Sequence, residues 1–174
     1  MSTWSILTGF SVREIGPAEQ FRADAVGPIG HRVFYLSIVA SGIPLWFVAE
    51  KQQVAAFAEL GQHMLEAAGV HADEDAVLQI EQRLAESAEL GDAEFRIGDL
   101  RLGLRENDMV SIILESVEED DEAVNFVIAP EQLQAAAAHA LRVVADGRPL
   151  CPRCGEPIDP GEYHRCPAVD PHLN

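Results

Sequence analysis

The spacing of hydrophobic residues divides the chain into strand-like and helix-like segments. Short runs rich in valine, isoleucine and aromatic residues predict strands. Hydrophobic residues that recur every three or four positions predict helices. We therefore expect strands at residues 21–26, 32–40, 45–49, 95–104, 109–117 and 123–129, and helices at residues 50–67, 73–90 and 130–145. The apolar residues of segment 1–14 are sparse and fit either a strand or an irregular cover over the core.

Residues with special backbone preferences mark the expected helix ends. Pro130 suits a first helical turn because its missing N–H is not needed there. Gly69, Gly91 and Gly147 follow the three helical patterns and are expected to end them. The acidic cluster at 73–75 favours a helix start at that point through the helix dipole.

The two halves of the chain show a similar order of segments. Each half opens with Phe-Arg, at Phe21 and Phe95, and continues through three strand patterns to a helix pattern. Around the strand-to-helix junctions, residues 46–48 with 53–54 match residues 125–127 with 132–133 at one fixed offset. We expect a duplicated three-strands-then-helix unit, at 21–67 and 95–145. Its fold class would be α+β, with a mainly antiparallel sheet covered by helices.

Length and charge limit the functions that fit. A chain of 174 residues suits one α+β domain, expected at 1–148, and a small tail at 149–174. The formal net charge of −17 disfavours binding to nucleic acid and to anionic membranes. There is neither an apolar run of membrane-spanning length nor a signal-peptide pattern at the amino terminus, so we expect a cytoplasmic protein.

All three cysteines of the chain fall in the tail, together with a histidine near the last one. Cys151 and Cys154 have the spacing of a metal knuckle, and His164 and Cys166 are two positions apart. Three thiolates and one imidazole suit Zn²⁺ and leave no coordination position for water. We expect these four residues to bind a structural zinc ion, with His172 as the other candidate for the histidine ligand.

Two other interpretations of the cysteines remain open. A redox-active Cys-x-x-Cys pair normally opens a helix, whereas Pro157 and Pro160 oppose a long helix after Cys154. A disulfide would leave one cysteine over in a chain without a secretory signal. Between the two ligand pairs, residues 159–161 predict a tight turn that brings the second pair back over the first.

The sequence also resembles a mostly actinobacterial family known only as a domain of unknown function. The resemblance covers roughly residues 15–167 and is carried by residues 21–27, 30–36, 50–54, 94–98, 147–155 and 164–167. It implies a zinc-ribbon-like tail and brings no established activity. The chain departs from the family pattern at Asp24, where a small residue is more typical, and after Pro167.

Polar residues at expected strand ends give a second candidate site. His31, Arg32, Glu50 and Lys51 would lie where side chains could converge on a small anionic ligand, although Glu50 and Lys51 also fit a plain helix start. The acidic run at 118–122 lacks the spaced ligands of a calcium loop and is expected to be a solvated loop.

No catalytic motif accompanies these features. We therefore expect a zinc-stabilised interaction or adaptor protein that binds another protein and has no catalysis of its own. The alternative is a ligand-binding or enzymatic α+β domain that uses the region of His31, Arg32, Glu50 and Lys51. A metal- or redox-responsive switch in the tail is a third hypothesis. The sequence does not define an oligomeric state.

Overall fold

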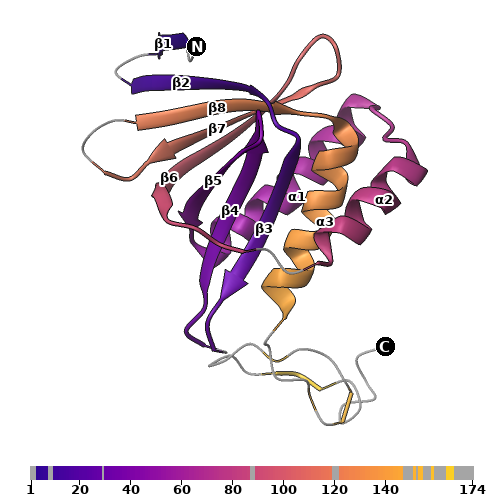
Figure 1. The fold of residues 1–174 in the computed structure, drawn as a ribbon. Coiled ribbons are helices and arrows are strands. Elements are labelled where there is room, and N and C mark those ends of the chain that lie inside the picture. Colours follow the sequence, from indigo (N-terminus) through magenta and orange to yellow (C-terminus); the bar gives the residue numbers. More distant parts are fainter. Residues whose placement is uncertain are drawn as a thin grey trace.

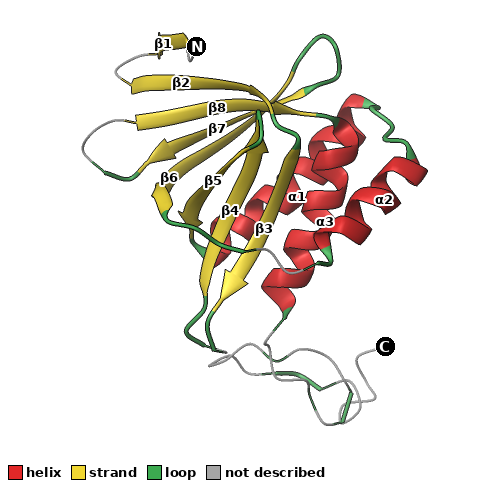
Figure 2. Ribbon diagram, viewed as in Figure 1, coloured by secondary structure: helices red, strands yellow, loops and turns green. Residues whose placement is uncertain are grey.

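The computed structural model describes residues 3–7, 10–28, 30–86, 89–118, 122–146, 151, 153–154, 158 and 164–166. The described residues form one sheet and three helices, which confirms the predicted α+β class (Figures 1 and 2). The strands are β1 (Thr3–Leu7), β2 (Phe10–Pro17), β3 (Gln20–Val26), β4 (Val33–Ala40), β5 (Ile43–Ala49), β6 (Ala93–Leu104), β7 (Val110–Ser116) and β8 (Glu122–Ile128). The helices are α1 (Lys51–Ala68), α2 (Glu74–Leu84) and α3 (Pro130–Ala145).

The strands lie in the order β1-β2-β8-β7-β6-β5-β4-β3. Five of the seven neighbouring pairs are antiparallel, and the pairs β2–β8 and β5–β6 are parallel. Between β2 and β3 the chain changes partner within two residues, since the Ala18 N–H donates to Val127 and the Glu19 N–H donates to Val39. The chain thus passes directly from β2, which pairs with β8, to β3, which pairs with β4. Strands β8 and β3 are the two ends of the series from β8 to β3, so this connection goes with a strongly curled sheet (Figure 1).

The two parallel pairs have the same register. Val48 of β5 lies opposite Arg96 of β6, and Val127 of β8 lies opposite Pro17 of β2. Both members differ by the same 79 positions (127 − 48 and 96 − 17). The register shifts agree as well, because the β5–β6 ladder skips one residue just before Phe95 and the β2–β8 ladder skips one just before Gly16.

The offset of 79 positions disagrees with one of the two sequence matches between the halves, the match of the Phe-Arg pairs. The offset of 79 aligns Phe21 with Leu100 and Phe95 with Gly16 (100 − 21 and 95 − 16), so the two Phe-Arg pairs are not structural equivalents. The match of residues 46–48 and 53–54 with 125–127 and 132–133 does have the structural offset.

A phenylalanine cluster forms the centre of the core between the sheet and the helices. The ring of Phe21 on β3 meets Phe57 of α1 edge to face at 5.2 Å and lies 5.5 Å from Phe126 of β8. All three side chains are almost completely buried. Buried apolar area is the main source of stability, so this contact between the first and last strands of the series helps to hold the sheet in its curled form.

Helix α2 ends earlier than its sequence pattern predicts. The expected helix extended to residue 90, with Gly91 as its stop, but α2 ends at Leu84. Arg22 of β3 donates to the carbonyl oxygens of Leu84 and Glu86, so a tertiary partner satisfies carbonyls that a longer helix would have used. Gly91 instead leaves room for the Trp46 ring, because a Cβ at this position would lie 2.4 Å from that ring.

Some other expectations can be compared residue by residue. Segment 1–14 contributes β1 and most of β2, which resolves the choice between a strand and an irregular cover. Pro130 is the first residue of α3, as predicted. Gly147, the 159–161 turn and the central part of the acidic run, 119–121, lie outside the described residues.

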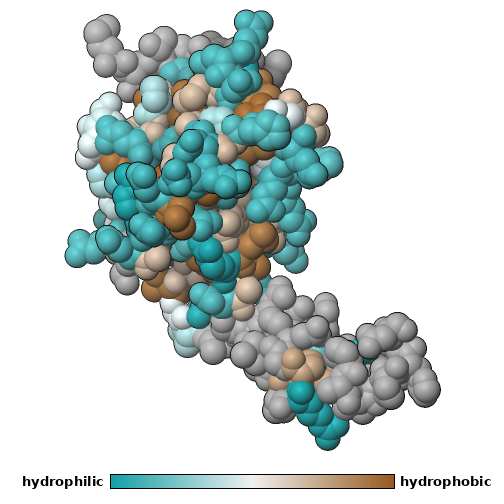
Figure 3. All heavy atoms as spheres, turned by 90° about the vertical axis from the view of Figure 1, so that its right-hand side faces the viewer, coloured by the Kyte–Doolittle hydropathy of each residue, from teal (hydrophilic) through white to brown (hydrophobic). Residues whose placement is uncertain are grey.

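Hydrophilic residues predominate on the face shown in Figure 3, and hydrophobic residues appear there as separate patches. The exposed large hydrophobic residues of the described part are Val26, Val33, Ile43, Leu60, Leu78 and Val117. Scattered exposed apolar residues are ordinary on a protein surface. Val26 and Val33 differ from the rest because they lie opposite each other at the end of the β3–β4 hairpin.

Candidate metal centre

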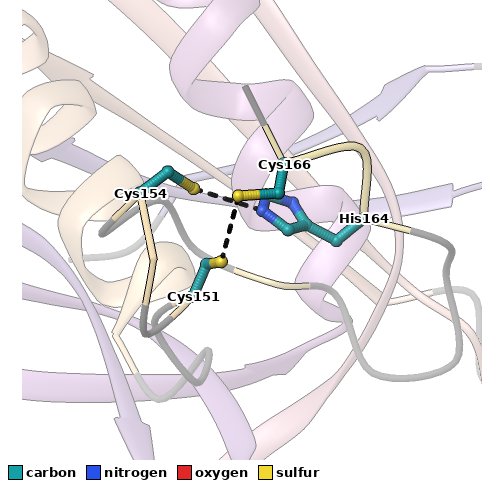
Figure 4. Close-up of side chains that lie close together, drawn as sticks. All are labelled: Cys151, Cys154, His164 and Cys166. Carbon is teal, nitrogen blue, oxygen red and sulfur yellow. Dashed lines mark hydrogen bonds between the residues drawn. The ribbon is translucent and has the colours of Figure 1, made fainter. Parts of the chain in front are cut away.

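Four side chains of the tail point toward one another (Figure 4). The Sγ atoms of Cys151 and Cys166 are 3.7 Å apart, and the Sγ of Cys154 lies 3.3 Å from the Nε2 of His164. One ligand atom from each of the four residues lies within 4.8 Å of all the others. The two sequence pairs therefore come together, and these four residues could hold a metal ion.

None of the three cysteines forms a disulfide. A disulfide needs an S–S distance of about 2.05 Å, well below the separation of Cys151 and Cys166. Cys151 is buried, while Cys154, His164 and Cys166 are partly exposed. The expected set of ligands is therefore assembled around one point close to the protein surface.

The local backbone favours the thiolate form of the first ligand. Hydrogen bonds from the backbone N–H groups of Arg153 and Cys154 lower the pKa of the Cys151 thiol to about 6. Thiolates, rather than thiols, bind metal ions. The backbone at Arg153 and Cys154 therefore favours the thiolate form of Cys151 even without a bound metal ion.

One hydrogen bond connects the β3–β4 hairpin to the start of the tail. The Arg32 guanidinium donates through Nη1 to the carbonyl oxygen of Asp146, 2.7 Å away, just after α3 ends. The β3–β4 hairpin is thereby bonded to the chain five residues before the first cysteine. His172, the other candidate for the histidine ligand, lies outside the described residues.

The four residues of the second candidate site lie near one end of β4 and β5. Phe34 pairs with Ala49, so Arg32 precedes this pair by two positions on one strand and Lys51 follows it by two on the other. Their described contacts are structural. Glu50 is the N-cap of α1 and forms an ion pair of 2.7 Å with Arg96, and the exposed His31 donates its backbone N–H to Pro28. Ligand binding by this group stays a prediction.

The sequence analysis did not single out a polar cluster on β3. The Asp24 carboxylate accepts two hydrogen bonds of 2.7 Å from Arg22, and its Oδ1 lies 3.8 Å from the Nε2 of His139 on α3. Burial alone would raise the pKa of Asp24, but the nearby His139 and the hydrogen bonds and charge of Arg22 lower it overall. No sequence motif could have revealed this cluster, because His139 comes from a distant helix; the departure of Asp24 from the family pattern was the only signal.

Comparisons with known proteins place the chain in a family without assigning an activity. No curated protein and no solved structure matches it at a significant level. Among the described residues, no helix is long and apolar enough to cross a membrane. One family model, described as "Protein of unknown function (DUF3090)", matches residues 14–166, a range that includes β3 to β8, the three helices and all four candidate ligands. The chain belongs to the DUF3090 family.

Proposed function

We propose that Cys151, Cys154, His164 and Cys166 bind one structural Zn²⁺ ion. Zinc–ligand distances of about 2.3 Å to sulfur and about 2.0 Å to nitrogen imply tetrahedral edges of about 3.8 Å between two sulfurs and about 3.5 Å between sulfur and nitrogen. The distances of 3.7 Å between Cys151 and Cys166 and 3.3 Å between Cys154 and His164 support this geometry.

The number and type of the ligands favour a structural role for the metal over a catalytic one. Catalytic zinc sites usually have three protein ligands and an open position for water or substrate, whereas four protein ligands close the site. Three thiolates and an imidazole also favour zinc over the hard cations, which prefer oxygen ligands. The closed set of four ligands is the observation that carries this proposal: the metal stabilises the tail and performs no reaction.

We infer that the metal-bound tail presents a binding surface for another protein. The adjacent surface is the end of the β3–β4 hairpin, which we call the hairpin end and define as Val26, Arg32 and Val33. The Arg32 side chain bonds this end to Asp146, just before the tail. Val26 and Val33 are 53% and 42% exposed, although both are β-branched apolar residues on paired strands. A partner that covered both the tail and this pair would bury apolar area that is now in water.

The remaining features support a cytoplasmic protein–protein function. Three cysteines outside any disulfide suit a reducing compartment. The net charge of −17 opposes binding to nucleic acid, the partner that a zinc-binding tail would otherwise suggest.

Affinity capture with matched variants tests the adaptor function. Wild-type protein should capture a partner in near-stoichiometric amount from native lysate of the source cells, and both Cys154→Ser and the double variant Val26→Thr/Val33→Thr should lose it. Ile43→Thr is the control, since Ile43 is 61% exposed at the start of β5, where it pairs with Ala40 at the end of β4 far from Val33. Equal capture by all four proteins, or capture that survives loss of the metal, would contradict the proposal.

A further inference from the structure

A cavity of about 160 Å³ lies between α2 and the start of β3, with Gln132 of α3 also lining it. Phe21 of β3 and Ile80 and Leu84 of α2 give it an apolar wall, and Arg22 and Arg83 also line it. An apolar cavity of about 150 Å³ accepts a benzene-sized molecule. The space therefore suits a compact apolar group of roughly six to eight carbon atoms.

Arg22 brings unused hydrogen-bond donors to this cavity. Its side chain is only 12% exposed, and its Nε and Nη2 atoms donate to Asp24 and to the carbonyl oxygens of Leu84 and Glu86. Within the described part of the chain, no acceptor is found for its Nη1, which carries two N–H donors. A nearly buried guanidinium is thus fixed at three acceptors while one nitrogen remains available to a ligand.

Among the described residues, Arg83 supplies the unpaired positive charge of the cavity, whereas the charge of Arg22 is already paired with Asp24. Arg83 forms no ion pair with any described residue. Glu19 also lines the cavity, but its carboxylate accepts the N–H of Gly42 in the β4–β5 turn, 3.3 Å away. Gln132 is fully engaged, because its amide oxygen caps α3 and its amide nitrogen donates to Ala18 and Glu19.

The approximate symmetry of the fold shows that α2 creates this site. The offset of 79 places Arg101 of β6 at the position equivalent to Arg22 (101 − 22). No second copy of α2 covers that position in the described chain, and the Arg101 side chain is 59% exposed. The equivalent arginine is therefore largely exposed to solvent in one half and lines a cavity in the other.

We propose that this cavity binds a small carboxylate with a compact apolar body, such as an aromatic or branched aliphatic acid. The apolar part would pack against Phe21, Ile80 and Leu84, and the carboxylate would accept from Arg22 Nη1 and from Arg83. Guanidinium donors suit a carboxylate because they can form two parallel charge-assisted hydrogen bonds with it. This site is separate from the metal centre and from His31, Arg32, Glu50 and Lys51.

Titration of the full-length, metal-loaded protein with benzoate tests the proposal. Benzoate should bind with a dissociation constant of roughly 0.1–5 mM and shift the methyl NMR signals of Ile80 and Leu84. Acetate, which lacks the ring, and benzyl alcohol, which lacks the charge, should each bind about tenfold more weakly or not at all. Arg83→Gln should weaken benzoate binding by about tenfold, whereas Arg101→Gln, which removes the same charge elsewhere, should leave it unchanged.

The contrary results are equally distinct. Absence of benzoate binding at about 10 mM would overturn the proposal, since even a weak small-ligand site would be filled at that concentration. Equal binding of benzyl alcohol would show that the guanidinium groups do not recognise the ligand. Equal binding of acetate would remove the role of the apolar wall, and equal losses in Arg83→Gln and Arg101→Gln would indicate an effect of net charge alone.

Discussion

Gln53 and Gln132 make the same set of hydrogen bonds at equivalent points of the fold. Each is the third residue of its helix, and its side-chain oxygen accepts the backbone N–H of the N-cap residue at 2.8 Å. The amide nitrogen of Gln53 donates to the carbonyls of Ile97 and Gly98, and that of Gln132 donates to those of Ala18 and Glu19. Gln53 therefore joins the start of α1 to β6, the parallel neighbour of β5, and Gln132 joins the start of α3 to the two residues that follow β2, the parallel neighbour of β8.

This correspondence extends the agreement in strand register. The glutamines and their acceptors all differ by 79 positions, as between Gln53 and Gln132 (132 − 53) or Ala18 and Ile97 (97 − 18). Equal register, equal bulges and equal helix caps are independent features of backbone and side chain. A duplicated unit, as expected from the sequence, would produce these agreements; the duplication stays a prediction.

Removal of either glutamine should destabilise the domain by a similar amount. Gln53→Ala and Gln132→Ala each lose one cap and two hydrogen bonds to strand carbonyls, and each should lower the free energy of unfolding by about 1–2 kcal/mol. Urea denaturation followed by circular dichroism measures the change. Gln52→Ala, at the exposed preceding position, is the control and should alter stability by less than about 0.5 kcal/mol. A large loss in one glutamine variant alone would contradict the equivalence.

Gly91 should tolerate no side chain. A Cβ at this position would lie 2.4–2.8 Å from three atoms of the Trp46 ring, and a bulky aromatic ring cannot yield without disturbing β5. Gly91→Ala should therefore cost about 1–3 kcal/mol in thermal or urea unfolding. Gly103→Ala is the matched control, because a Cβ there meets no atom within 4 Å and should be neutral or slightly stabilising. Equal stability of the two variants would show that the Gly91–Trp46 contact is unimportant.

Much of the fold could be predicted because its signals are local. The apolar periodicity of α1 and α3 and the β-branched runs of β4, β7 and β8 specify each element from its own residues. The end of α2 could not be predicted in this way, because the carbonyls of Leu84 and Glu86 are satisfied by Arg22, which lies more than 60 positions away. The parallel pairing of β2 with β8 is likewise a long-range choice that neither segment encodes alone.

The candidate sites also differ in how far they could be predicted, depending on whether their residues are close in the sequence. Cys151, Cys154, His164 and Cys166 lie within 16 positions of one another, and metal ligands are restricted to few residue types, so spacing was enough to group them. The cavity beside Arg22 is lined by β3, α2 and α3, and its residues become neighbours only in the folded chain. His31 and Arg32 directly precede β4, and Glu50 and Lys51 follow β5; ligand binding by these four residues stays a prediction.

Asp24 should make stability depend on acid pH. Its folded pKa lies below the ordinary value of 3.8, so the unfolded chain takes up this proton first as the pH falls, and stability is lost. Above about pH 5, wild type should be more stable than Asp24→Asn, and the difference should shrink as the pH falls below about 4. Urea unfolding from pH 7 to pH 3 measures this difference, with the exposed Asp92→Asn as the control for loss of one charge. A difference that stays constant or grows in acid would contradict the sign of the shift.

Removal of the metal should unfold the tail and spare the α+β domain. The main core is formed by the sheet with α1 and α3, and the tail ligands do not belong to it. Metal binding supplies folding free energy where the ligands are located. Hydrogen exchange with and without a chelator should therefore show loss of protection after residue 146 and little change in α1 and α3. Collapse of protection in both helices would show that the tail is part of one cooperative unit.

The coordination of the metal in the purified protein tests the central claim most directly. Metal analysis should find about one zinc per chain, and X-ray absorption at the zinc edge should show three sulfur ligands at about 2.3 Å and one nitrogen at about 2.0 Å. Cys154→Ser should lose most of the zinc. Metal-free protein with three reactive thiols, or zinc with an oxygen ligand that exchanges with water, would contradict a closed structural site formed by Cys151, Cys154, His164 and Cys166.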